Sequence, residues 1–324
     1  MTPTENGHKT VLRSSLGILA TGTATHGTGR DDDIPLPRLP GFVESAFSPL
    51  AYEAARQCLA ERPDGGTSRS SEAESGGGSR TAVALASTTG DTTTADLASR
   101  RMVSGRVHNP LLFMQATPNS VLGYLSREFG ITGQMFSLST LDDPVTELLA
   151  MADLLLEDPE VDRVLVVGVE LGGSERLAAA YEELAGGGGR SDPVPDPDPD
   201  PVPALPASAG LAAAVLLGRP GADAPVSVRS SETYDADAHP ETHPETDADI
   251  DSGSVASGRP GDIQGLFDLV AVHRRLVRDG GSRLLVTEPR APAFLLATDT
   301  EARANARPNA TTNARNETET HAHQ

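Results

Sequence analysis

The stretch "VDRVLVVGVE", residues 161–170, decides the fold. Its apolar run from Val164 to Val169 is broken only by a glycine, which is typical of a central strand buried on both faces of a parallel sheet. The preceding "PVTELLAMADLLLE" (144–157) predicts a helix, and Met135 to Thr140 predict a short strand before that helix. This alternation indicates an α/β protein with a doubly wound, mostly parallel sheet and flanking helices.

The flanking segments continue the same alternation on both sides. Apolar runs predict strands, and capped amphipathic patterns predict helices. The predicted strands are 11–24, 80–88 and 208–220, and the predicted helices are 48–62, 91–105, 118–130 and 262–280. "SRLLVTE" and "AFLLATD" near the end of the chain predict a hairpin, and the run from Leu111 to Met114 is expected in the core.

Composition sets the domain organisation. The chain has 324 residues with 32 Gly, 25 Pro and 3% aromatic residues. Blocks rich in Gly, Pro, Ser, Thr and Asp bury too little apolar surface to offset their ordering entropy, so roughly 200 residues remain for one domain. The expected organisation is a disordered start (1–10), a domain at 11–225 with disordered inserts near 64–79 and 186–204, an acidic linker (226–261), a helix and strands completing the domain (262–299), and a disordered tail (300–324).

Charge and cysteine content exclude several classes of protein. A net charge of −20 argues against nucleic-acid binding, which needs a basic surface. The single cysteine, Cys58, excludes an internal disulfide and a multi-thiolate zinc site, and its helical position predicts a buried small side chain. No apolar run reaches 18 residues and the start of the chain has no signal-peptide pattern, so we expect a cytoplasmic protein with no membrane contact.

The segment "GITGQMFSLSTLDDP" (130–144) is the first candidate site. A strand that leads directly into a helix N-terminus is where many α/β enzymes hold a nucleophile, because the helix-end amides stabilise an anion. Asp142 and Asp143 occupy this corner, with Glu147 one turn later. Paired carboxylates can do acid–base work, but acidic residues at a first helical turn also cap its amides, and this second interpretation is favoured.

Three further segments are weaker candidates. The loop "ATHGTG" (24–29) is neither a dinucleotide-binding nor a P-loop pattern and is interpreted as a flexible connector. His239, Glu241, His243 and Glu245 have metal-like spacing, but the prolines between them forbid a helix, so no metal site or cofactor is predicted. Asn119, at the start of the helix 118–130, is most simply a cap.

From Pro110 to Glu170 the chain resembles the N-terminal half of β-ketoacyl synthases, the thiolase-fold condensing enzymes of fatty-acid and polyketide synthesis. In that family an apolar segment opening with Pro leads to an Asn and a Gly, matched by Pro110, Asn119 and Gly123. A Gly then begins the strand to the nucleophile, matched by Gly133 and "MFSLST". A helix and a strand ending in Gly-x-Glu follow, matched by "ELLAMADLLL" and "VLVVGVE". The resemblance is looser over the rest of 11–220 and points to short, N-terminal-domain-only members.

The resemblance places the family's catalytic cysteine at Asp142, or at Leu141 if the register slips by one residue. Neither side chain can act as a thiolate. The family's active-site histidines and lysine belong to a C-terminal half that this chain mostly lacks. "HGTG" (26–29) imitates one histidine motif but stands before the first helix, which makes it a coincidence. His273 matches no motif and is expected on a helix surface.

The resemblance therefore implies a protein without the family's catalytic residues. The leading hypothesis is a non-catalytic subunit, like the chain length factors of type II polyketide systems, that associates with a ketosynthase or an acyl carrier protein. Phe113, Met114, Gln115 and Asn119 would then lie near the acyl tunnel or the interface. One alternative is a residual acyl-thioester enzyme (decarboxylase, hydrolase or acyltransferase) that uses Asp142. Another is an α/β binding or scaffold module with acidic disordered arms.

A physical argument also predicts oligomerisation. Ketosynthases stack two similar halves, so a chain with a reduced second half is expected to leave the helix 144–157 without one packing neighbour. Leu148, Leu149, Met151, Leu154 and Leu155 would be costly to expose. A heterodimer with a ketosynthase is the first expectation, and a homodimer is the alternative.

Overall fold

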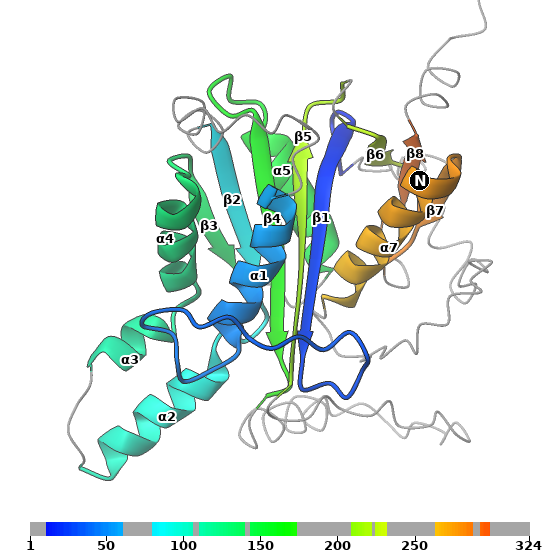
Figure 1. Ribbon diagram of the computed structural model, residues 1–324. Helices are drawn as coiled ribbons and strands as arrows, with labels where there is room; N and C mark the ends of the chain where they lie inside the picture. The colour runs from blue at the N-terminus through cyan, green and yellow to red at the C-terminus, as the bar shows by residue number, and fades with distance from the viewer. Residues whose placement is uncertain are drawn as a thin grey trace, which may run out of the picture.

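The computed structural model describes residues 11–60, 80–105, 110–139, 143–173, 209–221, 224–231, 263–287 and 292–298. Within these ranges eight strands form one sheet in the order β3-β2-β4-β5-β1-β6-β8-β7 (Figure 1). The strands are β1 Leu16–His26, β2 Thr81–Ala86, β3 Met135–Leu138, β4 Arg163–Leu171, β5 Gly210–Gly218, β6 Val226–Ser230, β7 Ser282–Leu285 and β8 Phe294–Thr298. The predicted α/β class is confirmed.

The sheet is mixed rather than mostly parallel in its pairings. β2 pairs in parallel with β3 and β4, whereas β5 lies antiparallel between β4 and β1. β1 to β4 therefore all run in one direction, as expected, and β5 runs against them. β6, β8 and β7 extend the sheet beyond β1 by antiparallel pairing. The predicted hairpin is confirmed in β7 and β8, whose short connection permits only antiparallel neighbours.

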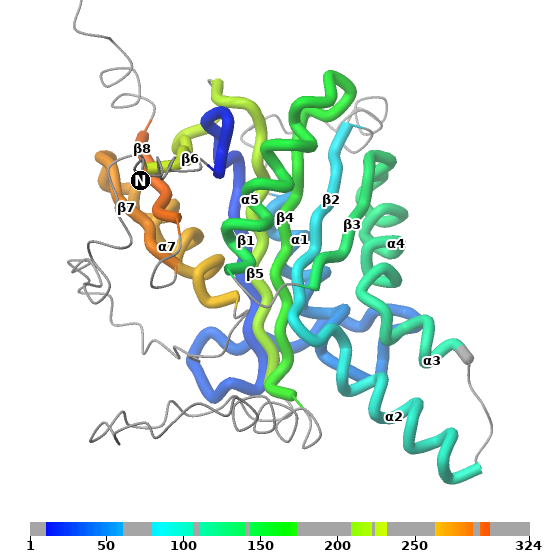
Figure 2. The backbone as a smooth tube through the Cα atoms, turned by 180° about the vertical axis from the view of Figure 1, so that it is seen from behind, coloured from blue at the N-terminus to red at the C-terminus, as the bar shows by residue number. Residues whose placement is uncertain are grey.

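Two pairs of helices cover the two faces of the sheet, and a further pair projects away from it (Figures 1 and 2). One core contains α1 and α4, and the other contains α5 and α7. α2 and α3 extend from the same end of the molecule. The helices are α1 Phe47–Ala60, α2 Thr92–Val103, α3 Pro110–Gln115, α4 Pro118–Phe129, α5 Pro144–Leu155 and α7 Gln264–Asp279.

Local sequence signals explain the helix ends and one close approach. α4 begins at Pro118 and ends at Gly130, whose left-handed φ of 65° suits glycine. α5 begins at Pro144 behind the cap Asp143. At Gly22 in β1, an added Cβ would lie 2.3 Å from the carbonyl oxygen of Ala54. Glycine therefore allows α1 to pack directly on the backbone of β1.

The apolar face of α5 is covered within the chain, which corrects the expectation of an exposed helix. Leu148 and Leu149 are fully buried, and α5 contacts α7. Of the five apolar residues in question, only Leu154 is exposed, at 50%. α7, which follows the acidic stretch in sequence, thus supplies the missing neighbour. The packing of α5 therefore gives no reason for oligomerisation.

The structure of two short segments, β6 and α3, differs from the sequence-based prediction. The sequence places Val226–Ser230 in the acidic linker, but this segment forms β6, which pairs with β1 and β8. The segment 111–114 was expected in the core but belongs to α3, in which only Leu112 of these four residues is buried. In both cases the element is five or six residues long, and its tertiary neighbours determine which residues are covered.

Candidate functional site

The candidate site is the edge at which β2, β3 and β4 end and α5 begins. β3 ends at Leu138, and Ser139 is the last described residue before the corner. Leu141 and Asp142, the two candidates for the nucleophile-equivalent position, lie outside the described residues. The chemistry of the corner must therefore be judged from the residues around it.

Asp143 is the N-cap of α5 and is 7% exposed. Its carboxylate accepts a hydrogen bond from the backbone N–H of Val145 at 3.0 Å. The hydroxyls of Thr146 and Thr287 donate to its other oxygen, each at 2.5 Å. The capping interpretation is therefore confirmed for Asp143. Thr287 follows β7, so this carboxylate also ties the corner to the C-terminal part of the sheet.

Glu170, at the end of the Gly-x-Glu motif in β4, holds the loop that follows β2. Its carboxylate accepts a hydrogen bond from the backbone N–H of Thr88. The hydroxyl of Ser139 donates to the carbonyl oxygen of Thr88 at 3.0 Å, and Ser87 N–H donates to the carbonyl of Leu138 at 3.1 Å. The three strand ends are thus joined through this one loop. Glu170 thus fixes the loop after β2, a structural role that the sequence did not predict.

The loop after β2 also carries buried polar groups. The hydroxyls of Thr89 and Thr92 are buried and make no hydrogen bond within the described structure. Asp91 caps α2 by accepting hydrogen bonds from Thr94 N–H at 3.0 Å and from the Thr94 hydroxyl at 2.7 Å. Burial raises the pKa of the Asp91 carboxyl above its ordinary value, and the bonds from Thr94 offset this only in part.

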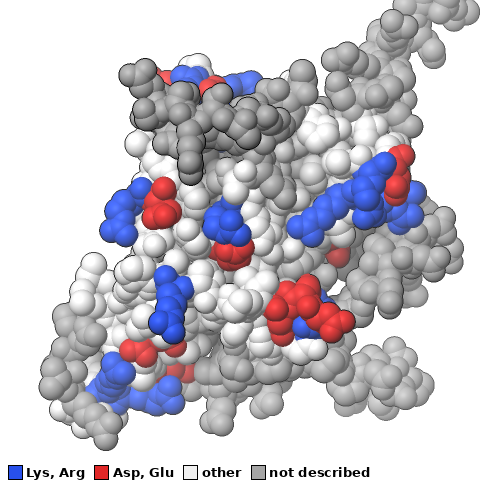
Figure 3. Space-filling model, viewed as in Figure 1, with Lys and Arg blue, Asp and Glu red and all other residues white. Residues whose placement is uncertain are grey.

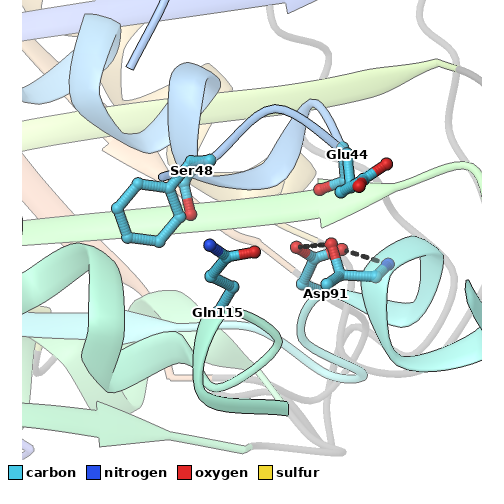
Figure 4. A pocket seen from close by; sticks show the side chains of 7 residues that line it. Glu44, Ser48, Asp91 and Gln115 are labelled. Carbon is cyan, nitrogen blue, oxygen red and sulfur yellow. Dashed lines mark hydrogen bonds between the residues drawn. The ribbon is translucent and has the colours of Figure 1, made fainter. Parts of the chain in front are cut away.

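A small recess lies beside Asp91, between α1, α2 and α3 (Figure 4). The Gln115 side chain, from the end of α3, lies between Ser48 and Asp91. The recess encloses about 160 Å³ including solvent at its mouth, and it is too narrow to hold a water molecule. It is lined by Phe42, Glu44, Ser45, Ser48, Asp91, Thr94 and Gln115. This recess is therefore no tunnel for an acyl chain.

The other predicted tunnel or interface residues are exposed. Phe113 and Met114 in α3 are 45% and 63% exposed, and Asn119 near the start of α4 is also exposed. Met102, Val103 and Leu111 add to the exposed apolar surface of α2 and α3. β3, the edge strand, lies on the same side of the molecule (Figure 1). Within this chain, the positions of Phe113, Met114 and Asn119 suit an interface better than an enclosed tunnel.

Cys58 and the loop after β1 have local structural roles. Cys58 is 1% exposed, and its thiol donates to the carbonyl oxygen of Ala214 at 3.2 Å, which confirms its place in the core. Asp33 holds the loop by accepting from the Thr28 hydroxyl at 2.7 Å and from Gly29 N–H at 2.9 Å. These bonds replace the expected flexible connector with a fixed turn. They also occupy an amide that a phosphate would need.

His273 was expected on a helix surface, but it is buried, with 7% of its surface exposed. Its Nδ1 lies 3.5 Å from the hydroxyl of Thr21 in β1, and its Nε2 has no hydrogen-bond partner among the described residues. Burial, assisted by the nearby charge of Arg274, lowers its pKa to about 4. The ring is therefore a neutral part of the contact between α7 and β1.

The described residues contain neither a metal site nor a membrane-spanning helix. Among the described residues, no group of three His, Cys, Asp or Glu side chains is placed to hold a metal ion. His239, Glu241, His243 and Glu245 fall outside those residues. Within the described ranges, no helix has the length and apolar character needed to cross a membrane.

Comparison with known proteins identifies the fold. No protein-family model matches the chain, and no curated protein matches it. A type II polyketide synthase acyl-carrier protein in complex with its ketosynthase bound to the hexaketide gives a TM-score of 0.53 at 11% identity, over 89% of this chain and 100% of that one. A ketosynthase in complex with its chain length factor from Xenorhabdus doucetiae gives a TM-score of 0.48 at 15% identity, over 87% of this chain and 99% of that one.

The ishigamide ketosynthase/chain length factor gives a TM-score of 0.49 at 15% identity, over 88% of this chain and 98% of that one. The mixed sheet with flanking helices thus matches the thiolase-like fold of ketosynthases. The alignment with the ketosynthase bound to the hexaketide, which gives the TM-score of 0.53, runs over the full length of that chain rather than over its N-terminal half alone.

Proposed function

We propose that this chain is a non-catalytic ketosynthase-like subunit that pairs with an active ketosynthase, as a chain length factor does. The observation that carries the proposal is the absence of a thiol from the nucleophile corner. Asp142 or Leu141 occupies the position that the resemblance assigns to the catalytic cysteine. The chain's single cysteine, Cys58, is buried in α1 with its thiol bonded to Ala214. Nucleophilic acyl transfer therefore has no candidate thiolate.

The surface that suits a partner is the side formed by β3 and α3. β3 is an edge strand whose Met135 is 39% exposed, and an open edge offers unpaired backbone groups to another strand. The exposed Phe113 and Met114 provide apolar area on the same side. The resemblance supports this choice, because nucleophile-bearing strands meet across the dimer interface in that family.

The partner follows from the same reasoning. A ketosynthase is the first partner, and an acyl carrier protein that serves the complex is the second. In this proposal the protein acts in the cytoplasm in polyketide-type or fatty-acid-type synthesis. The proteins of similar fold include a ketosynthase with its chain length factor and a ketosynthase with its carrier protein, which supports the pairing as an analogy of fold.

The test is co-purification of the tagged protein with a ketosynthase from the same organism, followed by size-exclusion chromatography with light scattering. A one-to-one heterodimer is expected. Phe113→Asp with Met114→Asp should abolish it, because two charges would be buried against the partner. Val277→Asp is the matched control, since Val277 on α7 is equally exposed at 51%. A monomer or homodimer that ignores the ketosynthase would contradict the proposal.

A second assay separates this role from residual thioester chemistry. Asp142→Asn removes the only carboxylate at the nucleophile-equivalent position, and we expect acyl-thioester hydrolysis and decarboxylation by the isolated chain to stay at background in both forms. Product formation by the heterodimer should be unchanged. Thioester turnover that is present in the wild type and lost in Asp142→Asn would favour the enzyme hypothesis instead.

A further inference from the structure

Four arginines form an exposed basic face at the end of α7. Arg274, Arg275 and Arg278 lie within about one turn of the helix, and Arg283 follows in β7. Arg274, Arg278 and Arg283 are exposed. A continuous blue area lies over α7 in Figure 3. We call these four residues the arginine face.

Some arginines of the molecule have a close carboxylate partner, whereas Arg278 and Arg283 of the arginine face have none among the described residues. Arg56 pairs with Glu53 at 2.7 Å, and Arg80 pairs with Asp162. On the arginine face, Arg275 lies 3.9 Å from Asp279 and Arg274 lies 3.4 Å from the Thr23 hydroxyl.

Arg278 and Arg283 form no ion pair with any described residue. The helix macrodipole favours a cation in the last turn, which accounts for Arg278, but Arg283 lies beyond the helix. The concentration of arginines therefore needs a further explanation.

The same chain contains a strongly acidic stretch next to this face in sequence. Residues 232–254 hold eight Asp or Glu and no Lys or Arg. The stretch lies outside the described residues, and the described chain resumes at Ile263, the residue before α7. A tethered ligand this close to its site has an effective concentration on the order of millimolar, so it outcompetes a free acidic protein of similar charge.

We propose that the acidic stretch 232–254 docks on the arginine face. Guanidinium groups bind carboxylates by charge-assisted hydrogen bonds and often in a bidentate manner, so several arginines on one surface fit an acidic peptide. A nucleic acid fits less well, because the net charge of −20 repels a phosphate polymer at long range. The docking is independent of the ketosynthase-like function.

The test measures binding of a fluorescent synthetic peptide of residues 232–254 to three forms of the full chain. The first is the wild type, in which the chain's own stretch should occupy the face. The second is a neutralised chain, with Asp→Asn and Glu→Gln at all eight positions of 232–254. The third is the neutralised chain that also carries Arg278→Gln and Arg283→Gln. Fluorescence anisotropy at low salt gives the affinities.

We expect the neutralised chain to bind the peptide at least about tenfold more tightly than the wild type, and the affinity to fall with added NaCl. The added arginine substitutions should weaken binding by about tenfold or more. Arg100→Gln with Arg127→Gln in the neutralised chain is the matched control, because α2 and α4 lie on the opposite side from α7 (Figures 1 and 2). These substitutions should leave the affinity unchanged.

Three results would overturn the proposal. Equal peptide binding by the wild type and the neutralised chain would show that the chain's own stretch does not occupy the face. An absence of binding to the neutralised chain would show that the two do not recognise each other. Unchanged binding after the substitutions at Arg278 and Arg283 would place the contact elsewhere on the molecule.

Discussion

At the scale of single residues, Asp143 has a structural role at the start of α5. Its carboxylate receives one backbone and two hydroxyl hydrogen bonds and is nearly buried. A carboxylate occupied in this way holds α5 and Thr287 in place. The sequence thus predicts that an acidic residue caps the start of α5. The hydrogen bond from Thr287, 144 residues away in the chain, can be seen only in the folded structure.

The first prediction concerns Asp143→Ala. It removes the cap of α5 and leaves the Thr287 hydroxyl without its acceptor, so the free energy of unfolding should fall by about 2 kcal/mol. Asp143→Asn is the matched control, because asparagine is an equally good cap and should retain most of the stability. Urea unfolding followed by circular dichroism measures both. Equal midpoints for the alanine variant and the wild type would contradict this role.

The second prediction concerns the pH dependence that His273 contributes. Its pKa is about 4 in the folded state, below the ordinary value of 6.5 expected in the unfolded chain. The unfolded state therefore binds more protons between these values, and stability falls as the pH drops from about 6.5 to about 4. The contribution lost over this window should be about 3 kcal/mol.

The measurement compares the free energy of unfolding at pH 7 and pH 5 for the wild type and His273→Leu. The variant keeps an apolar side chain against β1 but has no proton to bind, so its loss of stability on acidification should be smaller. An identical loss in both proteins would show that His273 is accessible to protons in the folded state. Comparing the two proteins removes the contribution of carboxylates that titrate in both.

At the scale of elements, the sequence predicts ends and patterns well where the signals are local. The Pro118 start and Gly130 end of α4 are confirmed, as is the start of α5 at Pro144. His273 also carried a local signal, because it follows the buried Leu266, Leu269 and Val270 at helical spacing. Its position on the apolar stripe of α7 indicated burial, even though its residue type suggested a surface.

Other features of the elements were beyond sequence reasoning. The placement of β5 between β4 and β1, and of β6 between β1 and β8, depends on contacts far apart in the chain. The five residues of β6 alternate apolar and polar side chains beside an acidic stretch, and only their strand partners make them a strand.

The third prediction tests the packing of α7 against α5 and the sheet. Leu269 is fully buried in the core that α7 shares with α5. Leu269→Ala should lower the free energy of unfolding by about 3 kcal/mol, because it leaves a cavity between helix and sheet. Leu154→Ala is the control, since Leu154 is 50% exposed on α5 and should change stability little. Similar small effects at both positions would show that α7 is loosely attached.

At the scale of the whole molecule, the sheet has two free ends with different surroundings. β7 ends the sheet beside the arginine face, and β3 ends it beside the exposed apolar residues of α3. An apolar surface next to an open strand edge suits a lasting protein interface, whereas an arginine-rich surface suits a charged and salt-sensitive contact. The ketosynthase partner of the proposed function is therefore assigned to the β3 end.

The last prediction tests this assignment through the backbone of β3. The carbonyls of Gln134 and Leu138 accept from Val83 and Ser87 on the β2 side, so by strand alternation the backbone groups of Ser137 point to the free edge. Ser137→Pro removes an outward N–H while leaving the bonds to β2 in place, because proline is tolerated in an edge strand whose N–H faces solvent. The variant should fold with nearly unchanged stability.

Pairing with the ketosynthase should weaken at least about tenfold in Ser137→Pro, if a partner strand adds to β3. Phe136→Pro is the contrasting variant, because the backbone of Phe136 faces β2. Losing the N–H of this residue should destabilise the monomer itself. Light scattering of the mixed proteins measures pairing, and urea unfolding measures stability. A heterodimer that survives in Ser137→Pro would move the interface away from the sheet edge, leaving the side chains of α3 to account for any pairing.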